Sequence, residues 1–283
     1  MPELNVIKAD GLIVPFDIEK VRRSLRRARV DPDVIEIIAD RVAGKVYDRM
    51  PTSELYSIVF GELKTLQKGS AGKYNLKKAI FQMGPTGFPF EKLIGALFET
   101  EGFTASTGQI VKGRCVSHEV DVVAEKGDLH YDAECKFHSF QGKVCDVKHA
   151  LYVHARFVDI GKELQSKAPH SVRKHKGWLV TNTRMTSDAI SYGTCVGLGL
   201  LSWDYPPEKS LRERIESSGL HPVTCLTRLS VKLKRQLLEK GIILCRDLIA
   251  ESQVLVELGL SQPKIDEVVD EAYAICDSST LQS

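Results

Sequence analysis

The sequence predicts a multidomain protein of mixed α+β and α/β structure. A β-hairpin with a helical bundle comes first, a central α/β domain follows, and a small helical domain ends the chain. The 283 residues exceed the roughly 100 to 200 residues of a typical domain. The apolar pattern changes twice, and stretches containing proline mark both changes, at Gly84–Pro89 and Tyr205–Glu208. We therefore expect domains at residues 1–83, 84–207 and 208–283.

The first domain opens with two short strands. Leu4–Lys8 and Leu12–Pro15 flank the turn Asp10-Gly11, which is the pattern of a β-hairpin. Helical periodicity starts near Asp17, and Thr52 or Ser53 is positioned as the N-cap of a later helix. The later helices expected in this domain are Ser57–Leu66 and Lys73–Gln82.

In the central domain helices and strands alternate, which is typical of α/β folds. The expected elements are a helix from Phe88 that stops at Gly102, strands Val116–Glu125 and Leu129–Phe137, a helix over Lys143–Leu164, a strand Trp178–Thr181, a helix over Ser187–Val196 and a strand Leu200–Asp204. Only helical periodicity remains in the last domain, in Val231–Glu239, Leu244–Ala250, Gln253–Leu258 and Lys264–Ile275.

Composition excludes two classes of protein. Hydrophobic residues make up 43% and charged residues 27% of the chain, which rules out wholesale disorder, and no apolar run approaches the roughly 18 to 20 residues that span a bilayer. The first residues lack the pattern of a secretory signal. The seven cysteines are scattered and odd in number, so we expect free thiols in a reducing cytoplasm.

Positive charge concentrates at the front of the chain. The first 83 residues carry 15 Lys+Arg against 11 Asp+Glu, although the net charge of the whole chain is only +2. Its densest part, Val21–Arg29, contains five arginines, and Arg22, Arg26 and Arg29 would share one helical stripe. This stripe is either a solvated helix face or a surface that faces the phosphates of a nucleotide or of DNA.

The central domain contains a charged strand pattern that suggests chemistry. Strict alternation in Leu129–Phe137 places His130, Asp132, Glu134 and Lys136 on one face. If Gly127-Asp128 is a two-residue hairpin turn, residues whose numbers sum to 255 lie opposite each other, and Asp121 faces Glu134.

Opposed carboxylates weaken a sheet unless a cation lies between them. A lysine two residues further along can orient a water bound to that cation, and Glu91, on the preceding helix, could supply another carboxylate. Asp121, Glu134, Lys136 and Glu91 are therefore the candidate catalytic residues. The alternative is an exposed strand face that happens to be charged.

These residues resemble the PD-(D/E)xK nucleases, and among them the Mrr-like restriction endonucleases. The motifs that carry the resemblance are Phe90-Glu91, His118–Val123, Glu134-Cys135-Lys136, Trp178–Thr183, Thr186–Ala189 and Leu200–Asp204. The resemblance implies a restriction-endonuclease-like α/β/α sandwich and hydrolysis of DNA phosphodiesters with Mg²⁺ or Mn²⁺. Asp121, Glu134 and the Cys135 carbonyl would bind the metal, and Lys136 would steer the attacking water. We expect a homodimer or higher homo-oligomer, because two-fold symmetry suits a double-strand break.

The first domain resembles the ATP-cone, the allosteric nucleotide module best known from ribonucleotide reductases. The motifs are Val6–Gly11, Val14–Val21, Pro51–Leu55 and Tyr74–Leu76. The resemblance implies that Lys8 and Lys20 contact phosphates, while Asp17 and Thr52 line the pocket of an ATP or dATP effector. No GxxxxGK[ST] loop occurs in the sequence, so we expect binding without hydrolysis.

Other features point less directly to function. The last domain is similar to helix-hairpin-helix modules around Leu237–Gly241 and Leu258–Ser261, although its excess of acidic residues fits a protein contact equally well. Cys145 and His149 lie four residues apart but lack a second ligand pair for zinc. His118 and His138 are either DNA contacts or structural. The leading function is a nucleotide-responsive endonuclease; the alternative is a non-catalytic, nucleotide-responsive DNA-binding or regulatory protein with a decayed nuclease fold.

Overall fold

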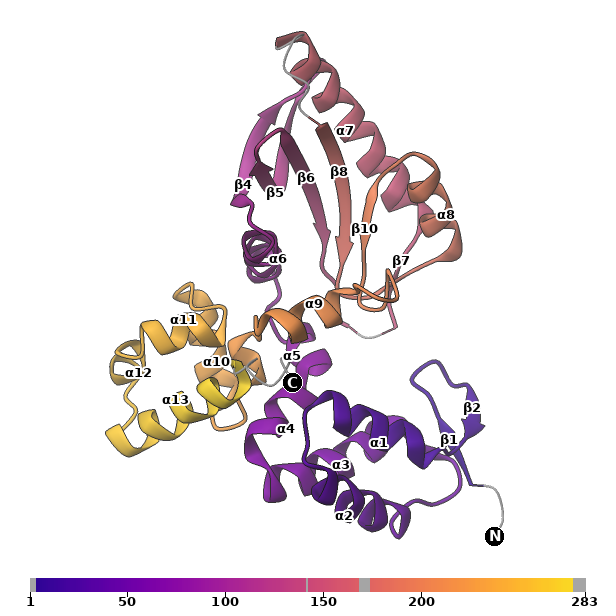
Figure 1. The fold of residues 1–283 in the computed structure, drawn as a ribbon, viewed down its shortest axis with the longest axis vertical. Coiled ribbons are helices and arrows are strands. Elements are labelled where there is room, and N and C mark those ends of the chain that lie inside the picture. The colour runs from indigo at the N-terminus through magenta and orange to yellow at the C-terminus, as the bar shows by residue number, and fades with distance from the viewer. Residues whose placement is uncertain (1–3, 141, 168–173, 277–283) are drawn as a thin grey trace. The chain divides into compact units, whose positions relative to one another are not determined.

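The computed structural model describes residues 4–140, 142–167 and 174–276 (Figure 1). The chain folds into two compact units. One is built from both ends of the chain, Met1–Ala79 and His221–Ser283, and the other is Ile80–Leu220. Among the described residues no helix is both long and apolar enough to cross a membrane.

The first unit begins with a small sheet. Strands β1 (Asn5–Ile7) and β2 (Ile13–Pro15) form the expected hairpin, and β3 (Met50–Pro51) pairs in parallel with β1. The helices that follow are α1 (Ile18–Arg27), α2 (Pro32–Ala43), α3 (Thr52–Leu66), α4 (Lys68–Tyr74) and α5 (Leu76–Phe81). Their buried core includes Leu25, Ile38 and Leu63, so the helices enclose one apolar centre.

Three helical expectations in this region need correction. Helix α3 begins at Thr52 with Pro51 as its N-cap and no side-chain cap hydrogen bond, so neither Thr52 nor Ser53 is the cap. The single helix expected over Lys73–Gln82 is divided into α4 and α5 at Asn75, whose side-chain oxygen accepts a hydrogen bond from the Tyr56 hydroxyl at 2.7 Å. Helix α1 ends at Arg27, and Arg29 adopts a positive φ of 56° beyond it. Arg29 therefore does not continue the helical stripe of Arg22 and Arg26.

The C-terminal helices of the first unit pack on its N-terminal helices. They are the 3₁₀ turn η1 (Val223–Cys225), α10 (Val231–Glu239), α11 (Cys245–Ala250), α12 (Val254–Glu257) and α13 (Gln262–Cys276). Helix α13 packs on α4, and a Cβ atom added at Gly72 would lie 2.3 Å from Ile275 Cδ1. The Thr224 hydroxyl donates a hydrogen bond to the Ala79 carbonyl at 2.8 Å. Close packing and a buried hydrogen bond thus join the two ends of the chain.

The central unit contains a five-stranded mixed sheet with strand order β10-β8-β6-β5-β4. Strands β4 (Thr104–Lys112), β5 (Ser117–Lys126) and β6 (Leu129–Lys136) are antiparallel, whereas β6, β8 (Lys174–Thr181) and β10 (Gly199–Leu201) are parallel. A separate parallel pair joins β7 (Val144–Cys145) to β9 (Arg184–Met185).

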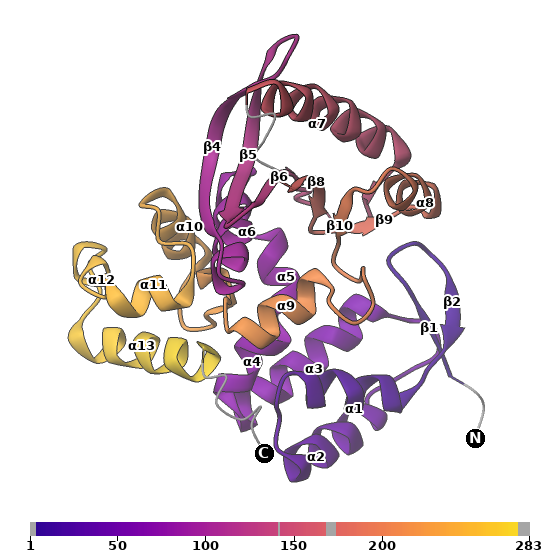
Figure 2. The same ribbon diagram turned by 45° about the horizontal axis from the view of Figure 1, so that its top comes forward.

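Helices cover both faces of this sheet (Figure 2). On one face, Phe98 of α6 (Phe88–Thr100) makes edge contacts with the rings of Tyr131 and Trp178. On the other, α7 (Val147–Lys167) and α8 (Ser187–Cys195) share a buried apolar cluster with Leu179 of β8. The unit is therefore layered as helix, sheet and helix, which is the mixed α/β architecture expected from the sequence.

The structure adds an edge strand, and its two compact units divide the chain at other places than the three expected domains. Strand β4 is missing from the elements expected above because its residues are mostly polar and exposed. Helix α9 (Leu211–Ser218) belongs to the central unit, where it contacts α6 and Arg214 forms an ion pair with Glu101 at 2.7 Å. The central compact unit therefore runs from Ile80 to Leu220 where a domain of residues 84–207 was expected, and the expected first and last domains lie in one compact unit.

Candidate functional site

The β5–β6 hairpin has the register expected from its turn. Its pairs run from Lys126 opposite Leu129 to Val122 opposite Ala133, and every pair sums to 255. Beyond the last of these pairs the Asp121 carboxylate accepts a hydrogen bond from the Cys135 amide at 2.7 Å. The predicted register is confirmed, and it places Asp121 beside the Glu134-Cys135-Lys136 segment.

Three half-buried carboxylates meet at this end of the hairpin. Burial, followed by the negative charges of Asp121, Glu119 and Glu134, raises the pKa of Glu91 to about 7. Burial also raises the pKa values of Asp121 and Glu134, and the charge of Asp121 adds to the effect on Glu134. Glu91 reaches this place from the first turn of α6. The cluster thus carries negative charge that a divalent cation would stabilise.

The donor set suits a hard cation such as Mg²⁺. Carboxylate and carbonyl oxygens are its preferred protein ligands, and Asp121 and Glu134 provide them. In a strand, the N–H and C=O of one residue point toward the same neighbouring strand, so the Cys135 carbonyl faces the same side as the amide bonded to Asp121. The Cys135 carbonyl and the Asp121 carboxylate therefore lie on the same side of β6, and the charge of Asp121 acts on the neighbouring Glu134 carboxylate.

Arg156 of α7 was not found by sequence reasoning. Its guanidinium forms an ion pair with the Oε2 atom of Glu134, donates to the Glu119 carbonyl and lies 5.3 Å from the centre of the Tyr152 ring. This cation offsets part of the charge of the cluster. Arg156 follows Glu134 by 22 residues, and only the packing of α7 on the sheet brings the two together, so no local sequence signal identifies it.

Lys136 and His138 extend the site past the end of β6. The Thr181 hydroxyl donates to the Lys136 carbonyl at 2.7 Å, and Asn182 exchanges two hydrogen bonds of 2.8 Å with the backbone of His138. Within the described part of the chain, the buried Nε2 atom of His138 has no hydrogen-bond partner. Burial and nearby positive groups lower the pKa of this imidazole, which keeps it neutral near pH 7.

His118 has a different environment. Its Nε2 atom lies 2.9 Å from the Asp159 carboxylate, and both side chains are mostly buried. That hydrogen bond lowers the pKa of Asp159 well below its usual range. We therefore assign His118 a structural role, and of the two histidines considered from the sequence only His138, two residues beyond Lys136, has a buried nitrogen without a hydrogen-bond partner among the described residues.

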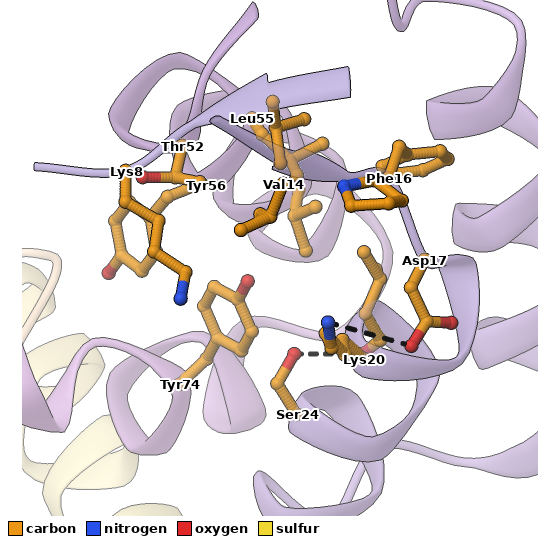
Figure 3. Close-up of a pocket in the computed structure, with 14 residues that line it drawn as sticks. Lys8, Val14, Phe16, Asp17, Lys20, Ser24, Thr52, Leu55, Tyr56 and Tyr74 are labelled. Carbon is orange, nitrogen blue, oxygen red and sulfur yellow. Dashed lines mark hydrogen bonds and ion pairs between the residues drawn. The ribbon is translucent and has the colours of Figure 1, made fainter. Parts of the chain in front are cut away.

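A cavity of about 210 Å³ lies in the first unit (Figure 3). Lys8, Asp17, Lys20 and Thr52 all line it, so the four nucleotide-site residues expected from the sequence come together in the structure. The Asp17 side chain also caps α1 by accepting from the Glu19 amide at 2.9 Å.

Aromatic side chains supply another part of the cavity wall. The rings of Tyr56 and Tyr74 stack with their centres 5.2 Å apart, and Val14 lies opposite them in the lining. Burial raises the pKa of Tyr74 to about 12 and that of Tyr56 further, so both hydroxyls keep their protons. Sequence reasoning assigned no role to Tyr56, which contributes to the wall because α3 is amphipathic.

The arginine stripe is largely neutralised. Arg22 binds Glu36 and Glu19, both at 2.8 Å, and Arg26 lies 3.8 Å from Glu19. These contacts favour the interpretation of a solvated helix face over that of a phosphate surface. Lys8 and Lys20, which line the cavity, are therefore the better candidates for phosphate contacts.

Comparison with known proteins identifies both ends of the chain. The family model of the ATP cone domain matches residues 4–81, which confirms the ATP-cone. The model described as "AF1548-like, C-terminal" matches residues 221–276. An uncharacterized protein of Archaeoglobus fulgidus is 38% identical over 180 residues, covering 63% of this chain and 97% of that protein. The chain belongs to the AF1548-like family. A crystal structure described as a protein of unknown function, AF1548, is 34% identical, with a TM-score of 0.54 over 68% of this chain and 98% of that one.

Proposed function

We propose that this AF1548-like protein is a DNA endonuclease that depends on Mg²⁺ or Mn²⁺ and responds to a nucleotide bound in its ATP-cone. One observation carries the catalytic part of the proposal. The Asp121 carboxylate is held by the Cys135 amide at 2.7 Å, next to Glu134 and Glu91, whose pKa values are raised in part by the charge of Asp121. Lys136 follows on the same strand. The order of these groups is that of the nuclease family which the sequence resembles.

Each group has a distinct part in the proposed reaction. Asp121, Glu134 and the Cys135 carbonyl would hold the metal ion, which would supply a Lewis acid and lower the pKa of its bound water. Lys136 orients the attacking water toward the phosphorus. Glu91 helps to position the cation or accepts a proton, since its pKa of about 7 matches that of an effective acid–base group at neutral pH.

The nucleotide-responsive part rests on the ATP-cone at residues 4–81 and on its cavity. Lys8 and Lys20 supply positive charge for phosphates, and the stacked Tyr56 and Tyr74 supply an apolar wall of the kind that receives a nucleobase or sugar. ATP or dATP is the proposed effector. Regulation requires that the nucleotide bind two arrangements of the protein with different affinity.

One contact favours the non-catalytic alternative. Arg156 already neutralises the Glu134 carboxylate, so the cluster can exist without a metal, as in a decayed nuclease that binds DNA for regulation. The two functions differ in whether the carboxylates are needed for phosphodiester cleavage.

Cleavage assays distinguish them directly. Supercoiled plasmid and branched DNA would be incubated with the full chain and Mg²⁺ or Mn²⁺, with and without ATP or dATP. We expect nicking or linearisation that is lost in Asp121→Asn and in Glu134→Gln. Asp128→Asn, an exposed position in the turn of the same hairpin, is the matched control and should cleave normally. Unchanged cleavage by both site variants would sink the catalytic proposal.

A second assay tests the nucleotide site. ATP, dATP and ADP would be titrated by calorimetry against the wild type and the double variant Lys8→Ala with Lys20→Ala, with and without DNA. We expect the double variant to bind at least about tenfold more weakly, since each phosphate contact is a charge-assisted hydrogen bond. Lys64→Ala, on an exposed position of α3 outside the cavity, should bind as the wild type. Failure of any nucleotide to bind below about millimolar would overturn the regulatory proposal.

A further inference from the structure

Two histidines and an aspartate meet in the central unit, at the other end of β6 from the carboxylate cluster. His130 and Asp132 lie two residues apart on β6 and share one face of the strand. His175 lies on β8, directly opposite His130 in the parallel ladder. Asp132 is fully buried. The side chains of His130 and His175 are 8% and 16% exposed, so the group lies just inside the surface.

The ring nitrogens of both histidines point at the aspartate. His130 Nε2 lies 3.1 Å from Asp132 Oδ1, and His175 Nε2 lies 2.8 Å from Asp132 Oδ2. One ligand atom from each of the three residues lies within 4.8 Å of the others. The register of the strands fixes this geometry, because it depends on backbone pairing rather than on flexible loops.

Both ring nitrogens of His130 face carboxylates, which a neutral imidazole with a single N–H cannot satisfy. Its second nitrogen, Nδ1, lies 3.0 Å from Glu125 Oε1, so each ring nitrogen faces a carboxylate. A neutral imidazole has one N–H and one lone pair, and a lone pair directed at a carboxylate is repelled. Either a second proton or a cation must satisfy the inner nitrogen.

We propose that His130, Asp132 and His175 form a binding site for a zinc-like divalent transition-metal ion, oriented by Glu125. Two imidazole nitrogens and one carboxylate oxygen are a donor set typical of Zn²⁺ and unsuited to Mg²⁺. Glu125 accepts the Nδ1–H of His130 and thereby leaves Nε2 free for the metal, which is the usual arrangement of a carboxylate behind a metal-bound histidine.

The distances are compatible with an ion at this place. A tetrahedral ion about 2.0 to 2.2 Å from each ligand separates the ligand atoms by about 3.4 Å. The two contacts of Asp132, one to each of its oxygens, are 3.1 and 2.8 Å, and the three ligand atoms lie within 4.8 Å of one another, so side-chain rotations would bring both nitrogens and one oxygen to that spacing. Glu125 is 49% exposed and marks the side from which an ion enters and from which a water completes the coordination.

Helix α7 leaves room for one of the ligands. A Cβ atom at Gly161 would lie 3.0 Å from His175 Nδ1, and the ring of Phe157 makes an edge contact with the imidazole. The bound ion would connect β6 to β8 beneath this helix. The site is separate from the carboxylate cluster and does not depend on the proposed nuclease activity.

Titration of the full chain with Zn²⁺ and with Co²⁺ tests the site. We expect Co²⁺ to give the visible absorption of a four-coordinate site with nitrogen ligands, and Zn²⁺ to displace it. X-ray absorption of the zinc-loaded wild type should show two imidazole ligands. These wild-type measurements need no variant, and a spectrum that indicates oxygen ligands alone would overturn the proposal.

Variants then locate the ion. His175→Gln should weaken Zn²⁺ binding at this site by at least about tenfold and remove the Co²⁺ absorption with nitrogen ligands, whereas Asp121→Asn at the carboxylate cluster should leave that absorption unchanged. His149→Gln tests the other zinc candidate considered from the sequence and should also have no effect. Tryptophan fluorescence confirms that each variant is folded. Absence of Zn²⁺ binding below millimolar would refute the assignment and indicate a proton-linked network only. Loss of binding in Asp121→Asn but not in His175→Gln would also refute it.

Discussion

Replacing Gly177 by alanine should weaken the packing of α7 on the sheet. A Cβ atom at this position would lie 2.1, 2.6 and 2.9 Å from Cδ2, Cγ and Cβ of Phe157, whereas carbon atoms in contact are normally about 3.5 to 4.0 Å apart. The Phe157 Cβ atom is fixed to the backbone of α7, so a new ring rotamer does not remove the clash. The helix or the strand must shift.

The expected loss is about 1.3 kcal/mol, the centre of a range that reaches about 2.6 kcal/mol. Overpacking of this kind costs about 1 to 3 kcal/mol, and the lower chain entropy of unfolded alanine returns about 0.4 to 1 kcal/mol. Gly95→Ala in α6 is a matched control of opposite sign. Its Cβ atom would lie 3.5 Å from Thr107 Cγ2, an ordinary contact, so this substitution should stabilise the unit by up to about 1 kcal/mol.

Urea unfolding followed by tryptophan fluorescence measures both changes. The two tryptophans of the chain, Trp178 and Trp203, both belong to the central unit, so the signal reports that unit alone. With a urea dependence of about 2 kcal/mol per molar, Gly177→Ala should lower the midpoint by about 0.6 M and by no more than about 1.3 M. A midpoint equal to or above that of the wild type would refute the packing argument.

Three further predictions concern the groups and the assembly that the proposed activity needs. Lys136→Ala should lower turnover by about 100-fold or more with a smaller effect on metal affinity, and calorimetry showing lost metal binding with normal turnover per bound metal would contradict that role. Glu91 keeps its proton up to about pH 7 in the folded protein but loses it near pH 4.3 when unfolded, so without metal the wild-type central unit loses stability as the pH rises between these values. Glu91→Gln should remove that loss, giving a higher urea midpoint than the wild type above pH 7 and an equal one below pH 4; a difference that is constant with pH would exclude this cause. Light scattering should show a dimer on DNA during double-strand cleavage, and a monomer that breaks both strands in one binding event would rule this out.

Local rules predicted much of the carboxylate cluster. The turn at Gly127 and the two-residue period of a strand were enough to place Asp121 beside Glu134, because hairpin pairing is set within a short segment. The four nucleotide-site residues were expected from the resemblance to the ATP-cone rather than from a local rule, and all four line the cavity.

Features that depend on distant segments could not be predicted. Arg156 and His175 reach β6 only through the packing of α7 and the parallel pairing of β8. The periodicity of the sequence indicates neither of these long-range contacts. Strand β4 lacks apolar alternation because it lies at an exposed edge of the sheet. At the break between α4 and α5, Asn75 accepts a hydrogen bond from Tyr56, 19 residues away.

The joining of the two chain ends in one unit has a consequence for synthesis of the protein. About 140 residues separate Ala79 from His221, and at about 5 to 20 residues per second a ribosome needs roughly 7 to 30 s to translate them. During that time the face of α4 that packs on α13 has no partner, whereas the central unit is already complete once Leu220 has emerged. A chain truncated before His221 should therefore keep a protease-resistant central unit and lose the resistance of its N-terminal helices.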